Sequence, residues 1–241
     1  MTSWKTYLDE NRPQFLEELL DFLRIPSISS LPEHAGEVQQ AAKWVSDRME
    51  KAGIEGVRIM PTEGHPVVYG EWLHAEGKPT VMIYGHFDTQ PVDPLDLWQS
   101  PPFEPEVRED RVYARGASDD KGNMLIPILA SEAWLQTSGS MPVNVKYLFE
   151  GEEEIGSRNL RGLIETRGQE FKADACIWEG GGRNLSGDPF IYLGLKGILT
   201  IGMSVKLLHG DAHSSYAPIL PSASWRLLQA LNSIKDPSDD R

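Results

Sequence analysis

The sequence has one cysteine, few basic residues and no long apolar run, and each shortage excludes a class of protein. Its 241 residues include 23 Lys and Arg against 36 Asp and Glu, which gives a formal net charge of -13 at pH 7. Binding to the phosphate backbone of nucleic acids needs clustered Lys and Arg, so this charge balance argues against a DNA or RNA partner. No stretch approaches the roughly 20 apolar residues of a membrane span.

The single cysteine, Cys176, cannot form an intrachain disulfide or a thiolate zinc site. It lies in the apolar run 175–178, from which we predict a buried and unreactive thiol in a reducing compartment. The N-terminus has no basic segment that leads into an apolar one, so we expect no secretory signal. These features predict a cytoplasmic protein with no membrane partner.

Apolar residues recur at helical spacing in some segments and form short continuous runs in others, and the two kinds alternate along the chain. We expect helices at residues 4–23 (divided in two by Pro13), 37–52, 123–134 and 160–167. We expect strands, apolar enough to be buried on both faces of a sheet, at residues 66–72, 80–85, 143–149 and 173–178. This alternation predicts an α/β fold, a layered sheet with helices on both faces.

The pattern changes after the glycines at 180–182. Residues 197–208 alternate like a half-exposed strand, and residues 222–234 have helical spacing. We therefore predict a first domain over residues 1–196 and the start of a small α+β domain over residues 197–241. We also expect the chain to be the N-terminal portion of a longer protein.

Acidic residues and a histidine follow several of the predicted strands. His86 and Asp88 come directly after the strand at 80–85, at the end where open α/β sheets build their sites. The spacing allows Asp88 to orient a metal-bound His86. A histidine at a strand end is, however, more often a hydrogen-bonded structural residue, and the pair alone does not decide between the two interpretations.

Two turns add further carboxylates. In residues 115–122, Asp119 and Asp120 precede a helix, where they could cap it or bridge two cations. Residues 150–157 contain four glutamates, and such a run is commonly a solvated loop, although like charges in a tight turn after an apolar strand favour a neutralising cation. Glu179 also follows a predicted apolar strand. Because acids or a histidine follow several strands and turns, the sequence favours a hydrolytic site for zinc, manganese or cobalt.

These segments resemble, in order, the motifs of the M20 metallopeptidases. The resemblance rests on residues 85–88, 115–122, 153–157 and Glu179, with further matches at 22–27, 98–103 and 211–215. Residues 119–122 and 211–221 are most similar to dipeptidases of the carnosinase and cytosolic nonspecific type. The resemblance implies a zinc-peptidase-like catalytic domain, followed by a lid domain that forms a homodimer.

The resemblance also implies two divalent metal ions, with zinc as the first expectation and manganese or cobalt as alternatives. His86 would be a terminal ligand of one metal, and Asp119 would bridge both. Glu154 would bind the second metal, and Glu179 would complete the ligand set of the first. A further late histidine ligand, which the family needs, has no match in this sequence.

The same resemblance implies roles for three other residues. Asp88 would orient the imidazole, and Glu153 would be the general base that takes a proton from the metal-bridging water. His213 would stabilise the oxyanion, reaching the site of a neighbouring subunit. The peptide bond between Asp119 and Asp120 would be cis.

Neighbouring acids compete for two of these roles. The family pattern Asp, any residue, Lys-Gly selects Asp119 over Asp120. The pattern Glu-Glu, any residue, Gly-Ser selects residues 153 and 154, so we expect Glu152 to be a solvated acid.

The predicted function is hydrolysis of the peptide bond of dipeptides or short peptides. Removal of an acyl group from an N-acylated amino acid, or carboxypeptidase action, is the enzymatic alternative, because the resembling deacylases and carboxypeptidases tend to carry Glu at the position of Glu179. A non-catalytic scaffold or an inactive fragment is the alternative of another class.

Overall fold

The computed structural model describes residues 3–234 with the exceptions of 179–181, 185, 193 and 195. These residues form two units, Met1–Ile191 and Tyr192–Arg241. Each unit is described by itself.

A five-stranded mixed sheet forms the centre of the first unit, in the spatial order β1-β2-β6-β3-β7. Strand β3 runs parallel to β6 and β7, whereas β2 is antiparallel to β1 and β6. Because His86 lies opposite Glu150 in the β3–β6 register, the C-terminal ends of these two strands meet at one edge of the sheet. The strands are β1 (Glu55–Met60), β2 (Val67–Trp72), β3 (Thr80–His86), β6 (Asn144–Glu150) and β7 (Ala175–Ile177).

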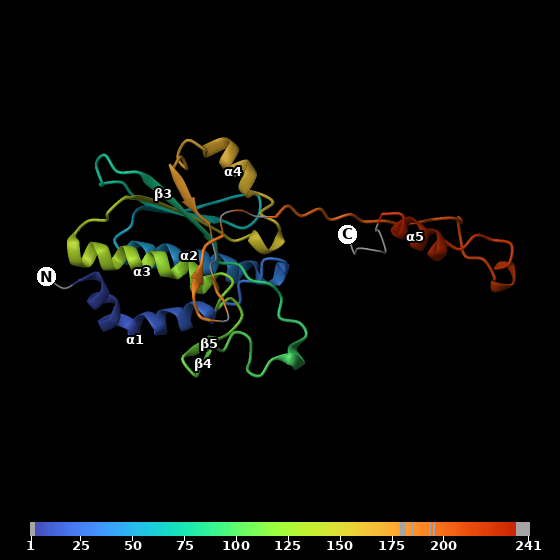
Figure 1. Ribbon diagram of the computed structural model, residues 1–241, viewed down its shortest axis with the longest axis horizontal. Helices are drawn as coiled ribbons and strands as arrows, with labels where there is room; N and C mark the ends of the chain where they lie inside the picture. Colours follow the sequence, from blue (N-terminus) through green and yellow to red (C-terminus); the bar gives the residue numbers. More distant parts are fainter. Residues whose placement is uncertain (1–2, 179–181, 185, 193, 195, 235–241) are drawn as a thin grey trace. The chain divides into compact units, whose positions relative to one another are not determined.

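Helices cover both faces of this sheet, as the α/β prediction required (Figure 1). Helices α2 (Ala35–Lys51) and α3 (Lys121–Ser138) pack on one face, and α1 (Trp4–Leu23) packs against α3. Helix α4 (Leu160–Arg167) lies on the opposite face, where Leu160 joins a smaller apolar cluster with Tyr69 and Leu148.

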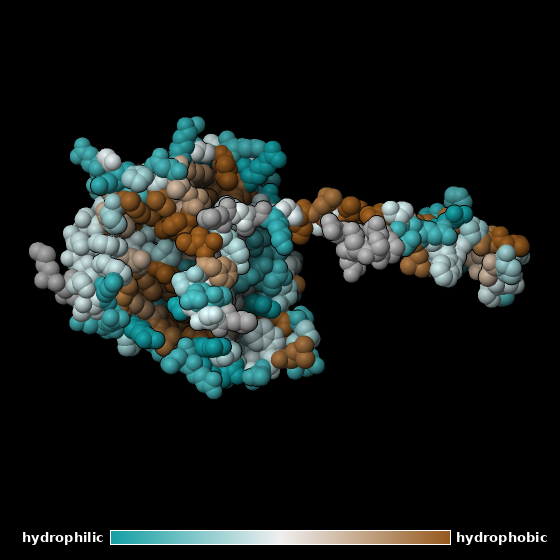
Figure 2. Space-filling view, viewed as in Figure 1, coloured by the Kyte–Doolittle hydropathy of each residue, from teal (hydrophilic) through white to brown (hydrophobic). Residues whose placement is uncertain are grey.

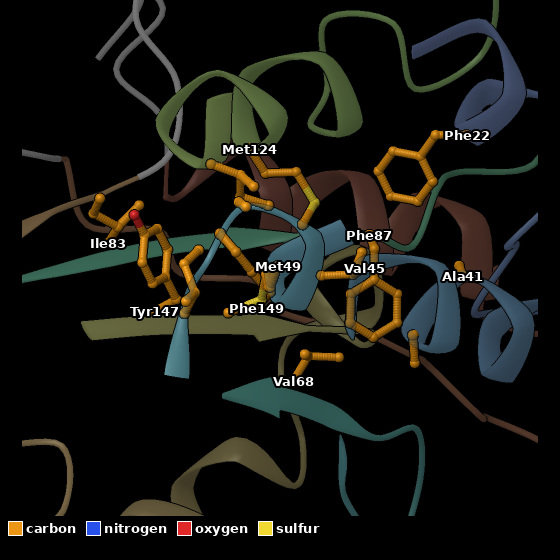
Figure 3. Close-up of a cluster of buried hydrophobic side chains, with 14 of the residues drawn as sticks. Phe22, Ala41, Val45, Met49, Val68, Ile83, Phe87, Met124, Tyr147 and Phe149 are labelled. Atoms are coloured by element: carbon orange, nitrogen blue, oxygen red, sulfur yellow. The ribbon is translucent and has the colours of Figure 1, made fainter. Parts of the chain in front are cut away.

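The larger core fills the space between the sheet and helices α2 and α3 (Figure 3). Alternate residues of the strands point into it, because successive side chains of a strand face opposite sides of the sheet. Val68 and Phe149 meet Met49 of α2 and Met124 of α3 in this cluster. At its margin the ring of Phe22 stacks on that of Trp44, with centroids 4.1 Å apart.

Short elements complete the described chain. Near the site, the turn η3 (Glu153–Ile155) follows β6 directly. The others are η1 (Pro32–His34), η2 (Leu95–Leu97), the hairpin of β4 (Glu106–Arg108) and β5 (Arg111–Tyr113), and the pair β8 (Gly182–Arg183) and β9 (Pro189–Phe190). The second unit contains η4 (Ser214–Tyr216) and α5 (Ala223–Asn232).

Three expectations about these elements were wrong. Pro13 lies inside one continuous helix, α1, because the loss of one backbone hydrogen bond on an exposed face is offset by the burial of neighbours such as Phe15 and Leu20. Residues 197–208 form no strand, because alternating polar and apolar residues form a stable strand only where a second strand pairs with them. Cys176 is exposed, because β7 is an edge strand with one neighbour and the described residues leave its side chains open to solvent.

The surface of the first unit carries apolar as well as polar residues (Figure 2). At the β7 edge, Ile177 and Trp178 are 58% and 52% exposed. Within the part of the chain that the structure describes, no helix is long and apolar enough to cross a membrane.

Candidate active site

The candidate site lies where β3 and β6 end, together with the turn that precedes α3. His86 is the last residue of β3, and Phe87 and Asp88 follow it directly. The turn η3 follows β6, and Asp119 and Asp120 precede the first residue of α3. Three segments distant in sequence therefore bring their polar side chains to one edge of the sheet.

His86 lies between two carboxylates, one on each side of its ring. Its Nε2 is 3.0 Å from Oδ1 of Asp119, and its Nδ1 is 3.2 Å from the backbone carbonyl oxygen of Asp88 and 3.3 Å from Oδ1 of the same residue. The imidazole is buried and so is Asp88, whereas the side chain of Asp119 is 75% exposed. The backbone carbonyl and the buried carboxylate of Asp88 both face Nδ1 and leave Nε2 directed outward, which is the arrangement by which proteins orient a metal-binding histidine.

Asp88 also fixes the turn that carries the two predicted site glutamates. Its Oδ1 accepts the backbone N–H of Glu153 at 3.2 Å, and its Oδ2 accepts that of Glu154 at 3.1 Å. One buried side chain thus positions both the imidazole and the backbone of η3.

The side chains of Glu153 and Glu154 lie on the site side of this turn. Oε2 of Glu153 is 3.8 Å from Nε2 of His86. Glu154 accepts a hydrogen bond from the side chain of Gln90 at 2.8 Å. Burial raises the pKa of Glu154, and the negative charge of Asp119 raises it further.

The peptide bond between Asp119 and Asp120 is cis, which confirms that prediction. The two side chains face different surroundings. Asp120 is buried, and its Oδ2 accepts the backbone N–H of His86 at 3.2 Å. Burial raises the pKa of Asp120 to about 6. Asp120 occupies the N-cap position of α3 but makes no capping hydrogen bond, so its carboxylate supports β3 instead of the helix.

Lys121 connects the site to the N-terminal segment. Its buried Nζ donates to the backbone carbonyls of Phe22 at 3.1 Å and Ile25 at 2.6 Å. Burial lowers the pKa of Lys121 to about 7, against the opposing effect of the negative charge of Asp88. The end of α1 is thereby held against the base of the site.

The four glutamates of residues 150–154 divide into two kinds. Glu150 and Glu152 are buried anchors: Glu150 accepts hydrogen bonds from the hydroxyls of Tyr84 and Ser157. Glu152 is 4% exposed, so the prediction of a solvated acid was wrong. Glu153 and Glu154 both lie on the site side, whereas Glu150 and Glu152 bond to partners elsewhere, and residue type alone does not reveal this division.

Two predicted site residues lie outside the part of the first unit that the structure describes. Glu179 lies outside the described residues. His213 belongs to the second unit, where its exposed ring bonds to the hydroxyl of Ser215 at 2.9 Å. The roles expected for both stay predictions.

The donor set fits a divalent cation in part. His86 and Asp119 present a nitrogen and an oxygen close to each other, and both are donor types that zinc accepts in proteins. Among the described residues, however, no three His, Cys, Asp or Glu side chains are close enough together to hold a metal ion. A complete ligand set would require Glu154 to close on the pair and a donor from outside the described residues.

A cavity of about 600 Å³ adjoins the turn before Asp119. Its lining includes Trp98, Tyr113, Ala117 and Ser118, of which the last directly precedes Asp119. Such a volume suits a small ligand.

Comparison with known proteins agrees with this arrangement. The model of peptidase family M20/M25/M40 matches residues 82–232, a range that contains the carboxylate and histidine cluster. The chain belongs to peptidase family M20/M25/M40. A solved structure has the same fold: the M20 family metallo-carboxypeptidase Sso-CP2 from Sulfolobus solfataricus. The two structures superpose with a TM-score of 0.80 and 39% sequence identity, and the match covers 92% of this chain and 50% of that one.

Two M20 relatives are named as dipeptidases. The chain is 30% identical to a cysteinylglycine-S-conjugate dipeptidase of Corynebacterium striatum over 98% of its own length and 52% of the relative's. It superposes on the dipeptidase Dug1p from Saccharomyces cerevisiae with a TM-score of 0.70 and 27% identity, over 95% of this chain and 51% of that one. The chain thus spans about half the length of the curated relatives that it matches.

Three contributors to the site were missed by sequence reasoning. Gln90 bonds to Glu154, Lys121 holds the end of α1, and Glu152 anchors η3. Lys121 belongs to the pattern that selected Asp119, and Glu152 stands next to Glu153, which was the available signal, whereas nothing in the sequence pointed to Gln90.

Proposed function

We propose that the protein containing this chain is a two-metal hydrolase that cleaves the peptide bond of dipeptides or short peptides. The observation that carries the proposal is the placement of Glu153 beside the His86–Asp119 pair, with Asp88 fixing both the imidazole and the Glu153 backbone. The dipeptidase names of two relatives support the choice of substrate class.

In this proposal the metal ligands are His86, Asp119, Glu154 and Glu179, with zinc as the first candidate and manganese or cobalt as alternatives. When bound, the cations would lower the pKa of a water molecule and polarise the scissile carbonyl. Asp88 keeps Nε2 of His86 directed outward, and Asp119 presents its exposed carboxylate toward the same space.

Glu153 acts as the general base at its carboxylate oxygens. It takes a proton from the attacking water and returns one to the leaving amine, as a carboxylate in a hydrolytic site can do in both directions. Its side chain is 35% exposed, so solvent and substrate can reach it. His213 would donate a hydrogen bond to the oxyanion from a partner subunit, as part of a cytoplasmic homodimer.

Carboxypeptidase or N-acyl-amino-acid hydrolase action is the second candidate. It is favoured by the likeness to the metallo-carboxypeptidase from Sulfolobus solfataricus and by the glutamate at position 179. Both candidates use the same residues and the same metal chemistry.

The test is to assay the complete gene product, loaded with zinc or manganese, against a panel of dipeptides, longer peptides and N-acyl amino acids. We expect kcat/KM to be highest for dipeptides. A preference for N-acyl amino acids or for C-terminal residues of long peptides would favour the second candidate. Metal content near zero after dialysis against either metal would overturn the site assignment itself.

A further inference from the structure

Glu152 makes an unusual number of hydrogen bonds for a residue in an acidic run. Its Oε1 accepts the backbone N–H of His65 at 3.0 Å. Its Oε2 accepts the backbone N–H of Asn159 at 3.1 Å, and the Asn159 side-chain amide donates to both oxygens, at 2.9 and 3.0 Å. A buried carboxylate therefore receives four N–H bonds from two segments, the loop before β2 and the start of α4.

The surroundings of this carboxylate are shaped to hold it. A Cβ placed on Gly64 would lie 1.9 Å from Oε1 of Glu152, so only glycine lets the loop approach so closely. The loop is itself ordered, because the hydroxyl of Thr62 accepts from the Gly64 N–H at 3.0 Å and donates to the His65 carbonyl at 2.6 Å. The imidazole of His65 also bonds to the carbonyl of Ser29 at 3.0 Å.

The side chain of Asn159 binds Glu152 and does not cap helix α4. It occupies the N-cap position of α4, yet its side chain makes no capping hydrogen bond there. Its two amide bonds go to Glu152 instead. The side chain of Asn159 therefore supports Glu152 in this structure and not the helix end.

We propose that Glu152 is a positioning residue that sets the placement of Glu153 for general-base catalysis. Glu152 and Glu153 are adjacent in the chain, and their side chains have opposite surroundings: one is bound among residues 64, 65 and 159, and the other faces His86. The backbone of Glu152 is also bonded to the turn that contains Glu153, because its carbonyl accepts the N–H groups of Ile155 at 3.2 Å and Ser157 at 2.8 Å.

Two carboxylates thus hold the turn η3 from opposite sides. Asp88 accepts the N–H groups of Glu153 and Glu154 from the site side, and Glu152 fixes the other side to the loop and to α4. If the Glu152 anchor were loosened, rotation of the turn would move the Glu153 carboxylate relative to His86. A displacement of about 1 Å in a catalytic group can reduce turnover about 10²-fold.

This inference rests on the proposed function, so the experiment has one arm that depends on activity and one that does not. The variants are Glu152→Gln, Asn159→Ala and Gly64→Ala in the complete gene product, with Glu63→Gln as the control, since Glu63 is exposed in the same loop. A glutamine replaces one acceptor oxygen with a donor NH₂, which opposes the N–H groups that face it.

In the activity arm, at saturating metal, we expect kcat to fall about 10- to 100-fold for Glu152→Gln and Gly64→Ala, with KM within about twofold of wild type. Asn159→Ala should give a smaller loss, because the Asn159 backbone bond and the His65 bond remain. Combining Glu152→Gln with Gly64→Ala should cost less than the product of the two single losses, because both act on the same contact. Glu63→Gln should leave kcat unchanged.

In the second arm, hydrogen exchange of the peptide that contains residues 153–157 is followed by mass spectrometry without substrate. We expect exchange there to be at least about 10-fold faster in Glu152→Gln, while peptides from β3 and α2 exchange as in wild type. Faster exchange across the whole protein, or unchanged exchange and unchanged kcat in all three variants, would overturn the proposal. If the wild type hydrolyses no substrate, the proposed function fails, and the exchange arm still decides whether Glu152 holds the turn.

Discussion

Asp88 accepts the backbone N–H of Glu153 with the same carboxylate oxygen that faces Nδ1 of His86, at 3.2 and 3.3 Å respectively. The placement of Glu153, the proposed general base, is therefore tied to the orientation of the imidazole. A change in this one buried side chain should disturb both.

We predict that Asp88→Asn lowers metal affinity and turnover together, each by about 10- to 100-fold. An amide has the same shape but only one acceptor oxygen and no negative charge, so it cannot accept both backbone N–H groups and it no longer places a charge beside Nδ1. Titration with zinc against a competing chelator, with kcat measured on the same samples, checks this. Asp96→Asn, in an exposed turn, is the control, and retention of wild-type metal affinity in Asp88→Asn would contradict the prediction.

We predict that Glu153→Gln keeps metal affinity but loses turnover by about 10² to 10⁴-fold, because an amide cannot accept the proton of the attacking water. Glu154→Gln should instead weaken metal binding. The measurements are kcat at saturating metal and the metal dissociation constant for each variant. Two variants that were indistinguishable in both measurements would show that the roles of these adjacent glutamates are wrongly divided.

We predict that His213 acts in the site of a partner subunit. Loss of one oxyanion donor typically costs about 10² to 10³ in turnover, so His213→Ala should be nearly inactive. Mixing His213→Ala with Glu153→Gln in the complete gene product would create heterodimers in which one site has both groups intact, and activity should recover. If subunits exchange, as shown by mass spectrometry of differently labelled chains, and activity stays absent, His213 does not act in trans.

We predict that Glu18 stabilises the fold at neutral pH and loses this effect in acid. Burial alone would raise its pKa, but hydrogen bonds from Gln14 and Lys51 and the charge of Arg48 leave the pKa below its ordinary value of 4.5. The folded state thus binds the proton of this group less readily than the unfolded state, so the stabilisation is fully present above pH 4.5 and disappears as pH falls through the lower, folded value.

Thermal unfolding of wild type and Glu18→Gln between pH 7 and pH 3 measures this effect. The melting temperature of Glu18→Gln should be lower at pH 7, and the difference should narrow below about pH 4.5. Glu17→Gln, which alters an exposed neighbour, should show a much smaller difference throughout. A difference that widened in acid would mean that Glu18 has the opposite sign of effect.

Most of the fold could be predicted from the sequence because its signals are local and strong. Residues 160–167 match α4 at both ends, and the apolar run at 80–85 lies within β3. The strand β1 was missed because it lies largely exposed at the sheet edge, and its polar and apolar residues do not alternate clearly. Its partner β2 was found because five of its six residues are buried.

The sequence by itself determined which residues are the candidates for the chemistry of the site. The order of the motifs identified His86, Asp88 and Asp119, and the structure brings these three together at the end of β3. Only the tertiary structure decided which of two adjacent acidic residues is buried and which faces the site. Asp120 and Glu152 have the same functional groups as the residues beside them, yet they are buried against backbone N–H groups and cannot face a substrate. The physical reason is that the direction of a side chain, and the partners that surround it, depend on how distant segments pack, and residue type does not encode that packing at a single position.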